Sequence, residues 1–446
     1  MTARILLADA DAFFVAVARR VDPEGAGRAR LLIVGGRPGS RGVVCSASYE
    51  TRAFGVRSAM PISRALRLCP DAMCVPVPRH ACSDASRAIR AVLGEFTPIV
   101  EGASIDEWYL DLTDTEALYH HAPLDDTARA IRAAVLDQTG YALSIGGGTN
   151  RMIAKLAAER AKPSRAPDAG GVRIIPAGRE RAFMATLTLA EIPGIGPKAQ
   201  ARLAGVGLVN VADVLAHDVA TLTRWLDRQT AEWLHARARG EARAAVEPRA
   251  PARGMSREET FDRDLARQEE LEAELRHLAR KVASDMREER LAARTITVKL
   301  KTNDFVSRTA SRTLPEPVES DRAVVETAVA LLAQLRLTHR KPARLVGVGL
   351  SNFKAGRDAE QFAMIFTPPA PGRADAPAGA AVVRSVTRSP GTVPDVPPVV
   401  ELTRDRDLSR AIDRVRERFG DDAIRSGPPR RRPVGEKGAR KPRDAR

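Results

Sequence analysis

The sequence predicts a multidomain α+β protein, and three stretches of its 446 residues support this fold class. In residues 5–161, short apolar strands alternate with amphipathic helices, and acidic residues stand at strand ends. Residues 183–240 are predicted to be helical throughout. Residues 255–353 return to strands with helices between them. A chain of this length is expected to form three or four domains.

The first stretch is predicted to form a sheet covered by helices. Its apolar runs favour strands at residues 5–7, 31–34, 43–49, 105–112 and 143–149. Helical periodicity, with Pro61 opening one helix and Pro163 halting another, predicts helices at 12–20, 50–54, 62–68, 84–96, 127–138 and 152–161.

Three acidic residues at the ends of two of these strands are the first candidates for chemistry. One strand runs into Asp9, and another contains Asp106 and Glu107. Neighbouring strand residues point to opposite faces, so a bend before Asp106, for which Ser104 is suited, is needed to direct both acids at one ion. Mg²⁺ favours such oxygen ligands, and two paired strands of this kind predict a phosphoryl-transfer site. Taken alone, an acid pair is more often solvated or salt-bridged surface.

The charge of the chain points to a polyanionic partner. The formal net charge is +15 and the pI is near 10.3. Residues 425–446 hold nine Lys and Arg against two acids, so the remainder of the chain is also basic. Because no run approaches the roughly 20 apolar residues of a spanning helix, nucleic acid is favoured over a membrane.

Cysteine usage predicts a reduced, cytoplasmic protein. The four cysteines show no CxxC spacing and no paired framework. The seven histidines are scattered, which argues against zinc. The N-terminus leads directly into a strand, so no signal peptide is expected.

The helical stretch carries a hairpin signature, Pro193-Gly-Ile-Gly-Pro-Lys198. A helix, a Pro-Gly-hydrophobic-Gly turn and a second helix place backbone N–H groups at a helix N-terminus, which suits a phosphate without reading bases. The alternative is an ordinary glycine-rich turn between helices. Residues 241–254 are predicted to be a linker.

The last sheet is predicted to carry cations and hydroxyls on one face. Strand 295–301 places Lys299 and Lys301 on one face and Ile296, Val298 and Leu300 on the other. Strand 308–314 repeats the pattern with Arg308 and Arg312. Such a face suits a nucleic-acid backbone, and the alternative is a solvated strand face. The other elements expected here are a strand at 256–261, helices at 268–289 and 321–335, and a strand at 344–350.

Beyond residue 366 the composition is rich in Pro, Ala and Arg, and disorder is expected. One helix is predicted at 408–419, with Ile412, Val415 and Phe419 on one stripe. The hydrophobic peptide 361–366 suits a groove on a partner, or alternatively a final strand of the preceding domain.

Seven motifs in this order resemble the Y-family of DNA polymerases, and the resemblance covers about residues 4–353. No single motif is decisive, but the ordered set is specific. They are Asp9-Ala-Asp-Ala-Phe-Phe14, Ser46-Ala-Ser-Tyr-Glu-Thr-Arg52, Phe54-Gly-Val-Arg-Ser-Ala-Met-Pro61, Ser104-Ile-Asp-Glu-Trp-Tyr-Leu-Asp-Leu-Thr113, Ser144-Ile-Gly-Gly-Gly-Thr-Asn150, Ala161-Lys-Pro163 and Ile192-Pro-Gly-Ile-Gly196.

The resemblance implies a right-hand polymerase. Its parts are a ferredoxin-like palm, small fingers, a helix-hairpin-helix thumb, an α/β little finger and a disordered basic tail. The implied bounds are 1–17 and 77–167 for the palm, 18–76 for the fingers, 168–240 for the thumb, 255–353 for the little finger and 354–446 for the tail.

The resemblance also implies roles for individual residues. Asp9, Asp106 and Glu107 would bind two Mg²⁺ ions, with the Ala10 carbonyl as a further ligand. Phe14 would be the steric gate that excludes a 2′-hydroxyl, whereas Phe13 is expected to be core. The residues implied in dNTP binding, besides Phe14, are Ser46, Tyr49, Arg52 and Lys162.

Partners are implied in the same way. Primer-template DNA would contact Gly194, Gly196 and Lys198 of the hairpin and Lys299, Lys301, Arg308 and Arg312 of the last sheet. A sliding clamp would bind the peptide that contains Gln361, Phe362, Met364 and Phe366. The protein is expected to be a monomer.

Two departures from the family pattern stand out. A glutamate usually follows the Phe-Phe pair after a few residues, and Ala18 occupies that place. Residues 164–169 are inserted between Lys162-Pro163 and Gly170-Gly171, where the family usually has Asn-Gly directly.

The function implied is low-fidelity translesion DNA synthesis, a two-metal phosphoryl transfer without proofreading. The alternative is a catalytically inactive, clamp-binding adaptor, which would lack some of the acids present here. A general basic nucleic-acid-binding protein would explain the charge but not the acidic strands.

Overall fold

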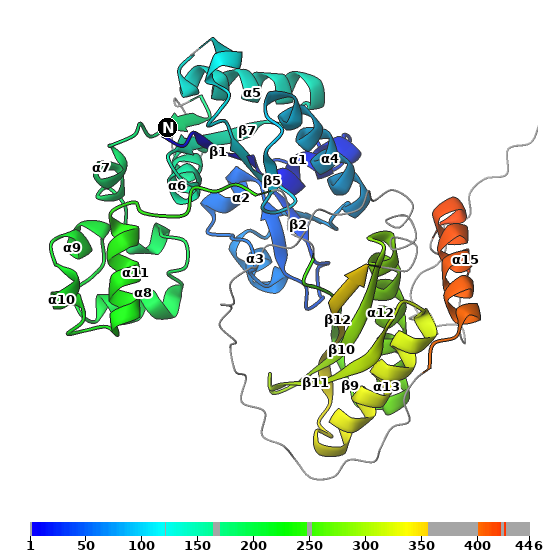
Figure 1. The fold of residues 1–446 in the computed structure, drawn as a ribbon. Helices are drawn as coiled ribbons and strands as arrows, with labels where there is room; N and C mark the ends of the chain where they lie inside the picture. Colours follow the sequence, from blue (N-terminus) through cyan, green and yellow to red (C-terminus); the bar gives the residue numbers. More distant parts are fainter. Residues whose placement is uncertain are drawn as a thin grey trace, which may run out of the picture. The chain divides into compact units, whose positions relative to one another are not determined.

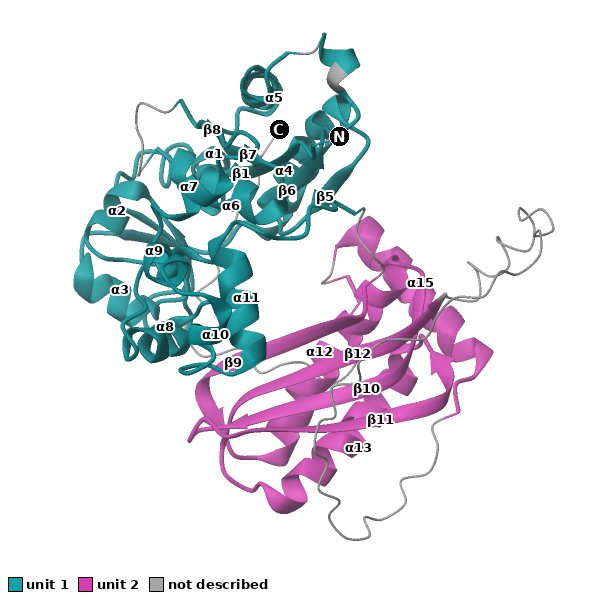
Figure 2. Cartoon of the chain, turned by 60° about the vertical axis from the view of Figure 1, so that its left-hand side comes forward, with its two compact units in different colours: residues 1–251 teal, residues 252–446 magenta. Residues whose placement is uncertain are grey.

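The computed structural model describes residues 2–120, 122–163, 170–247, 252–355, 400–420 and 423–424. The chain divides into two compact units, Met1–Pro251 and Ala252–Arg446 (Figures 1 and 2). The predicted palm, fingers and thumb all fall within the first unit. In the described part of the chain, no helix is both long and apolar enough to cross a membrane.

The first unit is organised around a five-stranded sheet of order β5-β6-β1-β7-β8. The central strand β1 is buried at every residue and pairs antiparallel with both β6 and β7. The strands are β1 (Ile5–Ala10), β5 (Val100–Gly102), β6 (Glu107–Asp111), β7 (Leu143–Gly148) and β8 (Val172–Ile174).

The two faces of this sheet are covered by different helices. Leu6 and Ala8 point toward α4 (Arg79–Phe96) and α5 (Leu124–Thr139), whereas Ile5 and Leu7 point toward α6 (Arg151–Ala161). This alternation is the period of two that a strand imposes.

Glycine sets how closely α6 approaches β7. A Cβ at Gly146 would lie 1.9 Å from the Ala158 nitrogen and 2.2 Å from the Ala154 oxygen. Only glycine leaves room for the helix backbone at this distance. The glycine run in β7 therefore allows α6 to lie directly against the sheet.

A smaller sheet of order β3-β2-β4 forms a second layer of the first unit. Ile33, Val44 and Ile62 are fully or almost fully buried in its core. The elements here are α1 (Phe13–Val21), β2 (Leu32–Gly35), β3 (Val44–Ala47), α2 (Tyr49–Ala53), α3 (Ile62–Leu68) and β4 (Met73–Val75).

Residues 180–238 are helical, as predicted, and share one apolar core. The helices are α7 (Glu180–Met184), α8 (Pro197–Ala204), α9 (Val211–Leu215), α10 (Val219–Leu222) and α11 (Arg228–Ala238). The predicted linker begins as packed chain, because Val246 is 7% exposed and lies with Ile5 and Leu7 on the central sheet.

The second unit is a four-stranded antiparallel sheet of order β11-β10-β12-β9. Helices α12 and α13 share an apolar core with it, in which Leu275, Val282 and Val324 are fully buried. The elements are β9 (Gly254–Leu265), α12 (Gln268–Glu288), β10 (Leu291–Thr302), β11 (Ser307–Val318), α13 (Asp321–Thr338) and β12 (Ala343–Ala355).

Helix α15 (Thr403–Phe419) lies against α12 and α13 and is held by polar contacts (Figure 1). The Arg287 side chain, 5% exposed, donates to Asp413 at 2.6 and 3.0 Å and to Asp321 at 2.9 Å. The Glu401 carboxylate accepts the backbone N–H groups of Glu319 and Ser320 at 2.9 and 2.5 Å. The segment therefore caps the start of α13.

Most predicted elements are present, with shifted ends. Helix α15 begins five residues before the predicted 408, and α4 begins five residues before the predicted 84. Strands β4, β5 and β8, with three residues each, were not predicted. A three-residue strand is too short to show a period of two in sequence.

Asp413→Ala is expected to loosen α15 from the second unit. The buried Arg287 guanidinium would lose one of its two carboxylate partners, and a charged buried hydrogen bond is worth about 1.5–3 kcal/mol. Hydrogen exchange at the Glu319, Ser320 and Asp321 amides should accelerate about tenfold or more. Asp407→Ala, an exposed acid of the same helix, is the control. Equal exchange in both variants would show that the ion pair does not hold the helix.

Candidate active site

The three acids predicted to act together lie at one edge of the central sheet. Asp9 stands directly opposite Glu107 in the antiparallel pair of β1 and β6. Asp106 precedes β6, and its carbonyl oxygen accepts the Ala10 N–H at 2.9 Å. The three acids that were grouped from the sequence are therefore neighbours in the structure.

The bend predicted before Asp106 is present at residues 103–106. The N–H groups of Ala103 and Ser104 both donate to the Glu107 carbonyl, at 2.9 and 3.3 Å. The Asp106 N–H donates to the Ser104 hydroxyl at 3.2 Å, and that hydroxyl donates to the Asp106 carboxylate. The Ser104 hydroxyl thus accepts from the Asp106 backbone and donates to the Asp106 side chain, and it replaces a backbone hydrogen bond of the turn.

Two lysines compensate the acids. Lys162 Nζ lies 3.0 Å from an Asp9 carboxylate oxygen, and Lys155 Nζ donates to both Glu107 carboxylate oxygens at 2.6 and 2.8 Å. Both lysines come from α6 or its C-terminal end. The helix that packs on β7 therefore supplies the positive charge for the acidic edge.

Burial governs the ionisation of Asp9, which is 8% exposed. Burial raises the pKa of Asp9 to about 7, Lys162 acts in the opposite direction, and the charges of Glu107 and Asp106 raise it further. Burial alone would lower the pKa of Lys162, but the carboxylates of Asp9 and Glu159 raise it above its ordinary value. The site thus holds a protonated lysine beside a carboxyl that binds protons readily.

The three acids offer the carboxylate oxygens that a hard cation prefers, but their side chains are not arranged around one point. Among the described residues, no three Asp, Glu, His or Cys side chains converge on one point. Instead, Asp9, Asp106 and Glu107 each contact a separate lysine or hydroxyl. The charges of Glu107 and Asp106 add to the effect of burial in raising the pKa of Asp9, and a divalent cation with oxygen ligands would relieve this repulsion.

A second group of predicted residues lies beside the acids. Tyr49 begins α2, whose N-terminus is capped by the Ser48 hydroxyl. The Arg52 guanidinium lies 5.1 Å from the centre of the Tyr49 ring, and its Nε donates to the Ala47 carbonyl at 2.9 Å. Burial raises the pKa of Tyr49 to about 12, so its hydroxyl stays protonated at neutral pH. Ser46, on β3, is 5% exposed.

Phe13 and Phe14 open α1 after a sharp turn. Ala12 has φ 46°, a left-handed conformation that is uncommon for a residue with a side chain. Phe13 is 2% exposed and belongs to the core of the central sheet, as expected. Phe14 is only partly buried, and its ring meets that of Phe13 edge-on at 5.5 Å.

Comparison with known proteins identifies the family. Residues 8–159 match the impB/mucB/samB family, and residues 252–364 match its C-terminal domain. A protein named DNA polymerase IV from Dehalococcoides mccartyi strain CBDB1 is 35% identical over 350 residues, 78% of this chain and 87% of that protein. The DNA polymerase IV of Caulobacter vibrioides is 38% identical over 77% of this chain and 82% of that protein. This chain belongs to the Y-family of DNA polymerases.

Solved structures agree. A chimeric Y-family DNA polymerase built on Dbh matches 78% of this chain and 98% of its own, at 24% identity and a TM-score of 0.68. An insertion ternary complex of Dbh DNA polymerase matches the same shares at 25% identity and a TM-score of 0.55. The fold is the right-hand polymerase fold. The chain is a DNA-directed DNA polymerase of the translesion class, a class that depends on metal ions, and these similarities give no support to an inactive adaptor.

The residue that departs from the family pattern, Ala18, lies in an apolar environment in this polymerase. It is 4% exposed and belongs to a cluster with Val15, Leu32 and Val34. A glutamate at this position would place a carboxylate between α1 and the β3-β2-β4 sheet. The alanine therefore fits the apolar side chains around it.

Three polar residues of this site were missed in the sequence. Lys155 lies seven residues before Lys162, and two helical turns place both on one side of α6, which is a signal that the spacing contains. Asp11 and Ser144 stand within recognised motifs but had no assigned role. The Ser144 hydroxyl donates to the Asp11 carboxylate at 2.7 Å.

The helical hairpin has the predicted form. Gly196 precedes α8, Pro197 opens it, and Lys198 is exposed. Gly194 has φ +100°, a conformation that residues with a side chain rarely adopt, and a Cβ there would lie in tight contact with the Trp233 ring at 3.3 Å.

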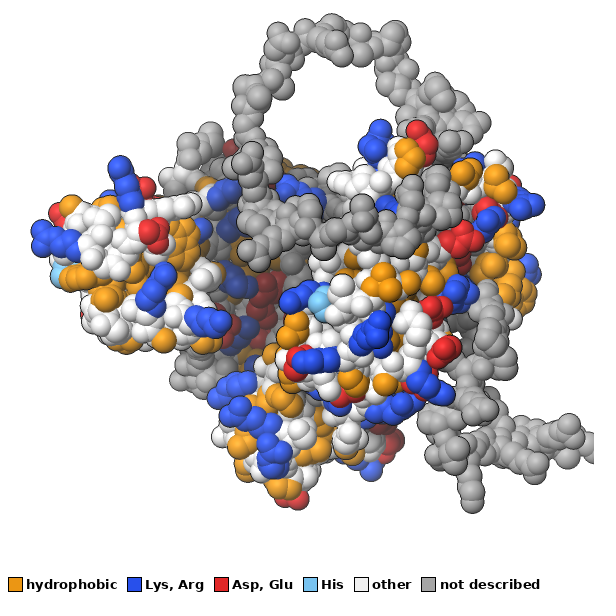
Figure 3. All heavy atoms as spheres, turned by 90° about the horizontal axis from the view of Figure 1, so that it is seen from below, with side chains coloured by type: hydrophobic (Ala, Val, Ile, Leu, Met, Phe, Trp, Pro, Cys, Tyr) orange, Lys and Arg blue, Asp and Glu red, His pale blue; other side chains and the backbone are white. Residues whose placement is uncertain are grey.

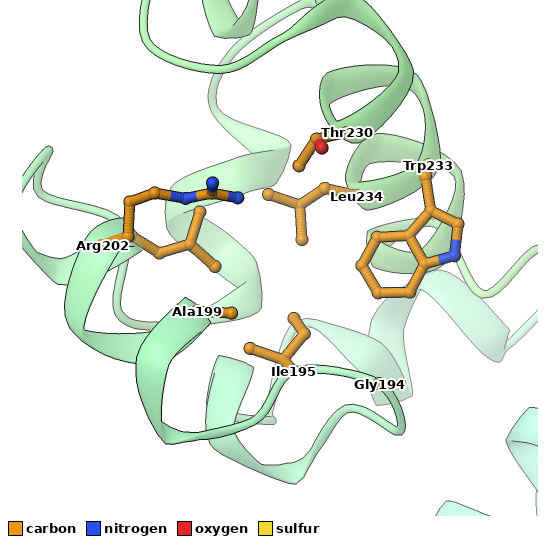
Figure 4. Close-up of a pocket in the computed structure, with 8 residues that line it drawn as sticks. Gly194, Ile195, Ala199, Arg202, Thr230, Trp233 and Leu234 are labelled. Atoms are coloured by element: carbon orange, nitrogen blue, oxygen red, sulfur yellow. The ribbon is translucent and has the colours of Figure 1, made fainter. Parts of the chain in front are cut away.

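Around this hairpin lies a pocket of about 280 Å³, in which Trp233 faces Gly194 and Ile195 while Arg202 lies on the opposite side (Figure 4). Arg202 is exposed and follows Lys198 by four residues on α8, so the two cations share one side of the helix. Sequence analysis had not included Arg202.

The prediction of a single cationic face in the last sheet is wrong for two residues. Arg312 lies opposite Ile296 and Arg308 opposite Leu300, so both arginines share the face that α12 and α13 cover. Lys299 and Lys301 lie with Thr309 and Ser307 on the other face. The cause is register, because residues at even positions of β11 face those at even positions of β10.

The remaining lysine face is polar but partly neutralised. Lys299 is paired with Glu258 at 2.9 Å, and Lys301 lies 5.0 Å from the Phe305 ring centre. Lys and Arg side chains are spread over much of the surface seen in Figure 3. The clamp-like residues Gln361, Phe362, Met364 and Phe366 and the insertion 164–169 lie outside the described residues.

Ala18→Glu is expected to lower the free energy of unfolding of the first unit by about 3 kcal/mol or more, because it buries a charge among apolar side chains. Urea denaturation measures the change. Val21→Glu, at a position of α1 that is 56% exposed, is the matched control and should be nearly neutral. Equal stability of the two variants would mean that residue 18 has a polar partner.

Proposed function

We propose that this polymerase adds dNTPs to a primer 3′ end with Asp9, Asp106 and Glu107 as the ligands of two Mg²⁺ ions. The observation that carries the proposal is the pairing of Asp9 with Glu107 in β1 and β6, next to the bend that holds Asp106. The Ala10 carbonyl, at the end of β1, is the proposed backbone ligand.

Bound cations would supply the charge that lowers the pKa of the primer hydroxyl and neutralises the triphosphate. The lysines prepare the site for them. Lys155 pairs with the Glu107 carboxylate, and the charge of Lys162 offsets part of the rise in the pKa of Asp9 that burial causes. Carboxylate oxygens are the ligands that a hard cation favours.

Tyr49, Arg52 and Lys162 are proposed to bind the triphosphate, with Ser46 in the same pocket. The support is their position, since the charges of Arg52, Lys162 and Asp9 all act on the Tyr49 hydroxyl. A protonated hydroxyl and two cations suit a polyanion. Phe14, partly buried at the start of α1, is proposed to lie beneath the sugar and exclude a 2′-hydroxyl.

Primer-template DNA is the proposed macromolecular substrate, and the similarity to a ternary complex of Dbh DNA polymerase supports it. The hairpin with Gly194, Gly196 and Lys198 would contact phosphates through backbone N–H groups, and Lys299 and Lys301 would contact them through charge. The sliding clamp remains a proposed partner of residues 361–366. We also propose that the protein works as a monomer in the cytoplasm, a reducing compartment in which its four free thiols would stay reduced.

Asp106→Ala or Glu107→Ala is expected to lower primer extension by about a thousandfold, because each removes a proposed ligand of the metal ions. DNA affinity should change little, which a fluorescence anisotropy titration can check. Asp114→Ala, an exposed acid shortly after β6, is the control. Normal extension by either test variant would refute the metal assignment.

Phe14→Ala is expected to reduce discrimination between dNTP and rNTP, as the ratio of their kcat/KM values, by at least about tenfold. The smaller side chain leaves room for the 2′-hydroxyl. Phe54→Ala, at a position 52% exposed, is the control. Unchanged discrimination in the Phe14 variant would place the steric gate elsewhere.

A further inference from the structure

A partly buried carboxylate next to the proposed catalytic acids, that of Asp11, has no part in the function proposed above. Asp11 follows the end of β1, and its N–H donates to the Ala142 carbonyl at 3.0 Å. One carboxylate oxygen accepts the Ser144 hydroxyl at 2.7 Å and the Tyr49 hydroxyl at 3.4 Å. The other oxygen is buried and has no hydrogen-bond partner among the described residues.

A buried polar atom normally has a hydrogen-bond partner, so an unpartnered carboxylate oxygen lowers the stability of the fold and calls for an explanation. Burial raises the pKa of Asp11, while the hydrogen bond from Ser144 and the charges of Lys162 and Arg132 act in the opposite direction. The Asp11 oxygen that has partners thus accepts from two hydroxyls, those of Ser144 and Tyr49.

The contacts of Asp11 join three separate segments of the first unit. Ser144 lies on β7, opposite Asp9 of β1, and these two strands are adjacent in the sheet (Figure 1). Tyr49 lies on α2, which follows β3 of the small sheet in sequence and precedes β4. The ring of Tyr49 is fixed from one side by Arg52, and its hydroxyl reaches Asp11. The 2.7 Å hydrogen bond from Ser144 fixes the Asp11 carboxylate, which also accepts the Tyr49 hydroxyl.

We propose that Asp11 is a positioning residue that, anchored by Ser144, holds the Tyr49 hydroxyl in place for the incoming triphosphate. The proposal rests on the triphosphate role of Tyr49 in the proposed function. Asp11 acts through Tyr49 and is not itself a ligand of the nucleotide. With the tyrosine already oriented, nucleotide binding need not order it.

The consequence is a split between kinetic constants. An interaction that orders a binding residue contributes equally to substrate and transition state, so its loss raises KM for dNTP and leaves kcat nearly unchanged. A ligand of the reacting centre would instead lower kcat.

The test is a double-mutant cycle in the full chain, with steady-state dNTP incorporation on a primer-template. Asp11→Ala is expected to raise KM for dNTP about tenfold, which corresponds to the loss of one hydrogen bond. Asp11→Asn, whose amide oxygen still accepts the Ser144 hydroxyl, should recover most of this loss. In a Tyr49→Phe background, Asp11→Ala should have no further effect. Asp137→Ala, an exposed acid of α5, is the control.

The opposite outcomes are distinct. If Tyr49→Phe raises KM but Asp11→Ala raises it by the same factor in both backgrounds, the positioning role is overturned and the proposed function stands. A fall in kcat with constant KM, or a lower KM, also overturns it. If Tyr49→Phe alone leaves KM unchanged, the triphosphate role of Tyr49 fails, and the positioning role fails with it. Should Asp11→Ala not fold, Ser144→Ala replaces it in the cycle with the same expectations.

Discussion

The interaction on which this active site depends is the compensation of a buried negative charge by one helix. Asp9 is 8% exposed and stands beside two other carboxylates. An isolated buried carboxylate would be too costly to keep ionised. Lys162 and Lys155 provide the compensation, and both reach the acids only because α6 lies directly on β7. Gly146, where any Cβ would collide with α6, is therefore a requirement of the electrostatics as much as of the packing.

The same arrangement gives each of the three acids a partner. The partner is a lysine or the Ser104 hydroxyl, so none of the three is an unpaired charge. In the proposed function, divalent cations bound by the acids would supply this compensation, and Lys162 would be free to bind the triphosphate. A lysine suits this exchange because its ammonium is a point charge on a flexible stem.

The sequence predicted the parts of the site that lie along single strands, and it failed where register or three-dimensional approach decides. Asp9, Asp106 and the bend at Ser104 are local features of chain direction. Arg308 and Arg312 were assigned to the wrong face because the register between β10 and β11 is not contained in either strand alone. Lys155 carried a signal only in its distance from Lys162.

Helix α15 is a second case in which the sequence predicted an element but not its contacts. Its apolar stripe predicted a helix, but not the ionic contacts that attach it. Asp405, Ser409 and Asp413 recur at intervals of four and form the face directed at α12 and α13. A polar face normally indicates solvent, but here Arg287, Asp321 and Arg322 bind it and make it an interface. The first unit follows the same principle at Asp11, a partly buried acid directly after β1, whose place is explained by the hydroxyls that donate to it rather than by the strand before it.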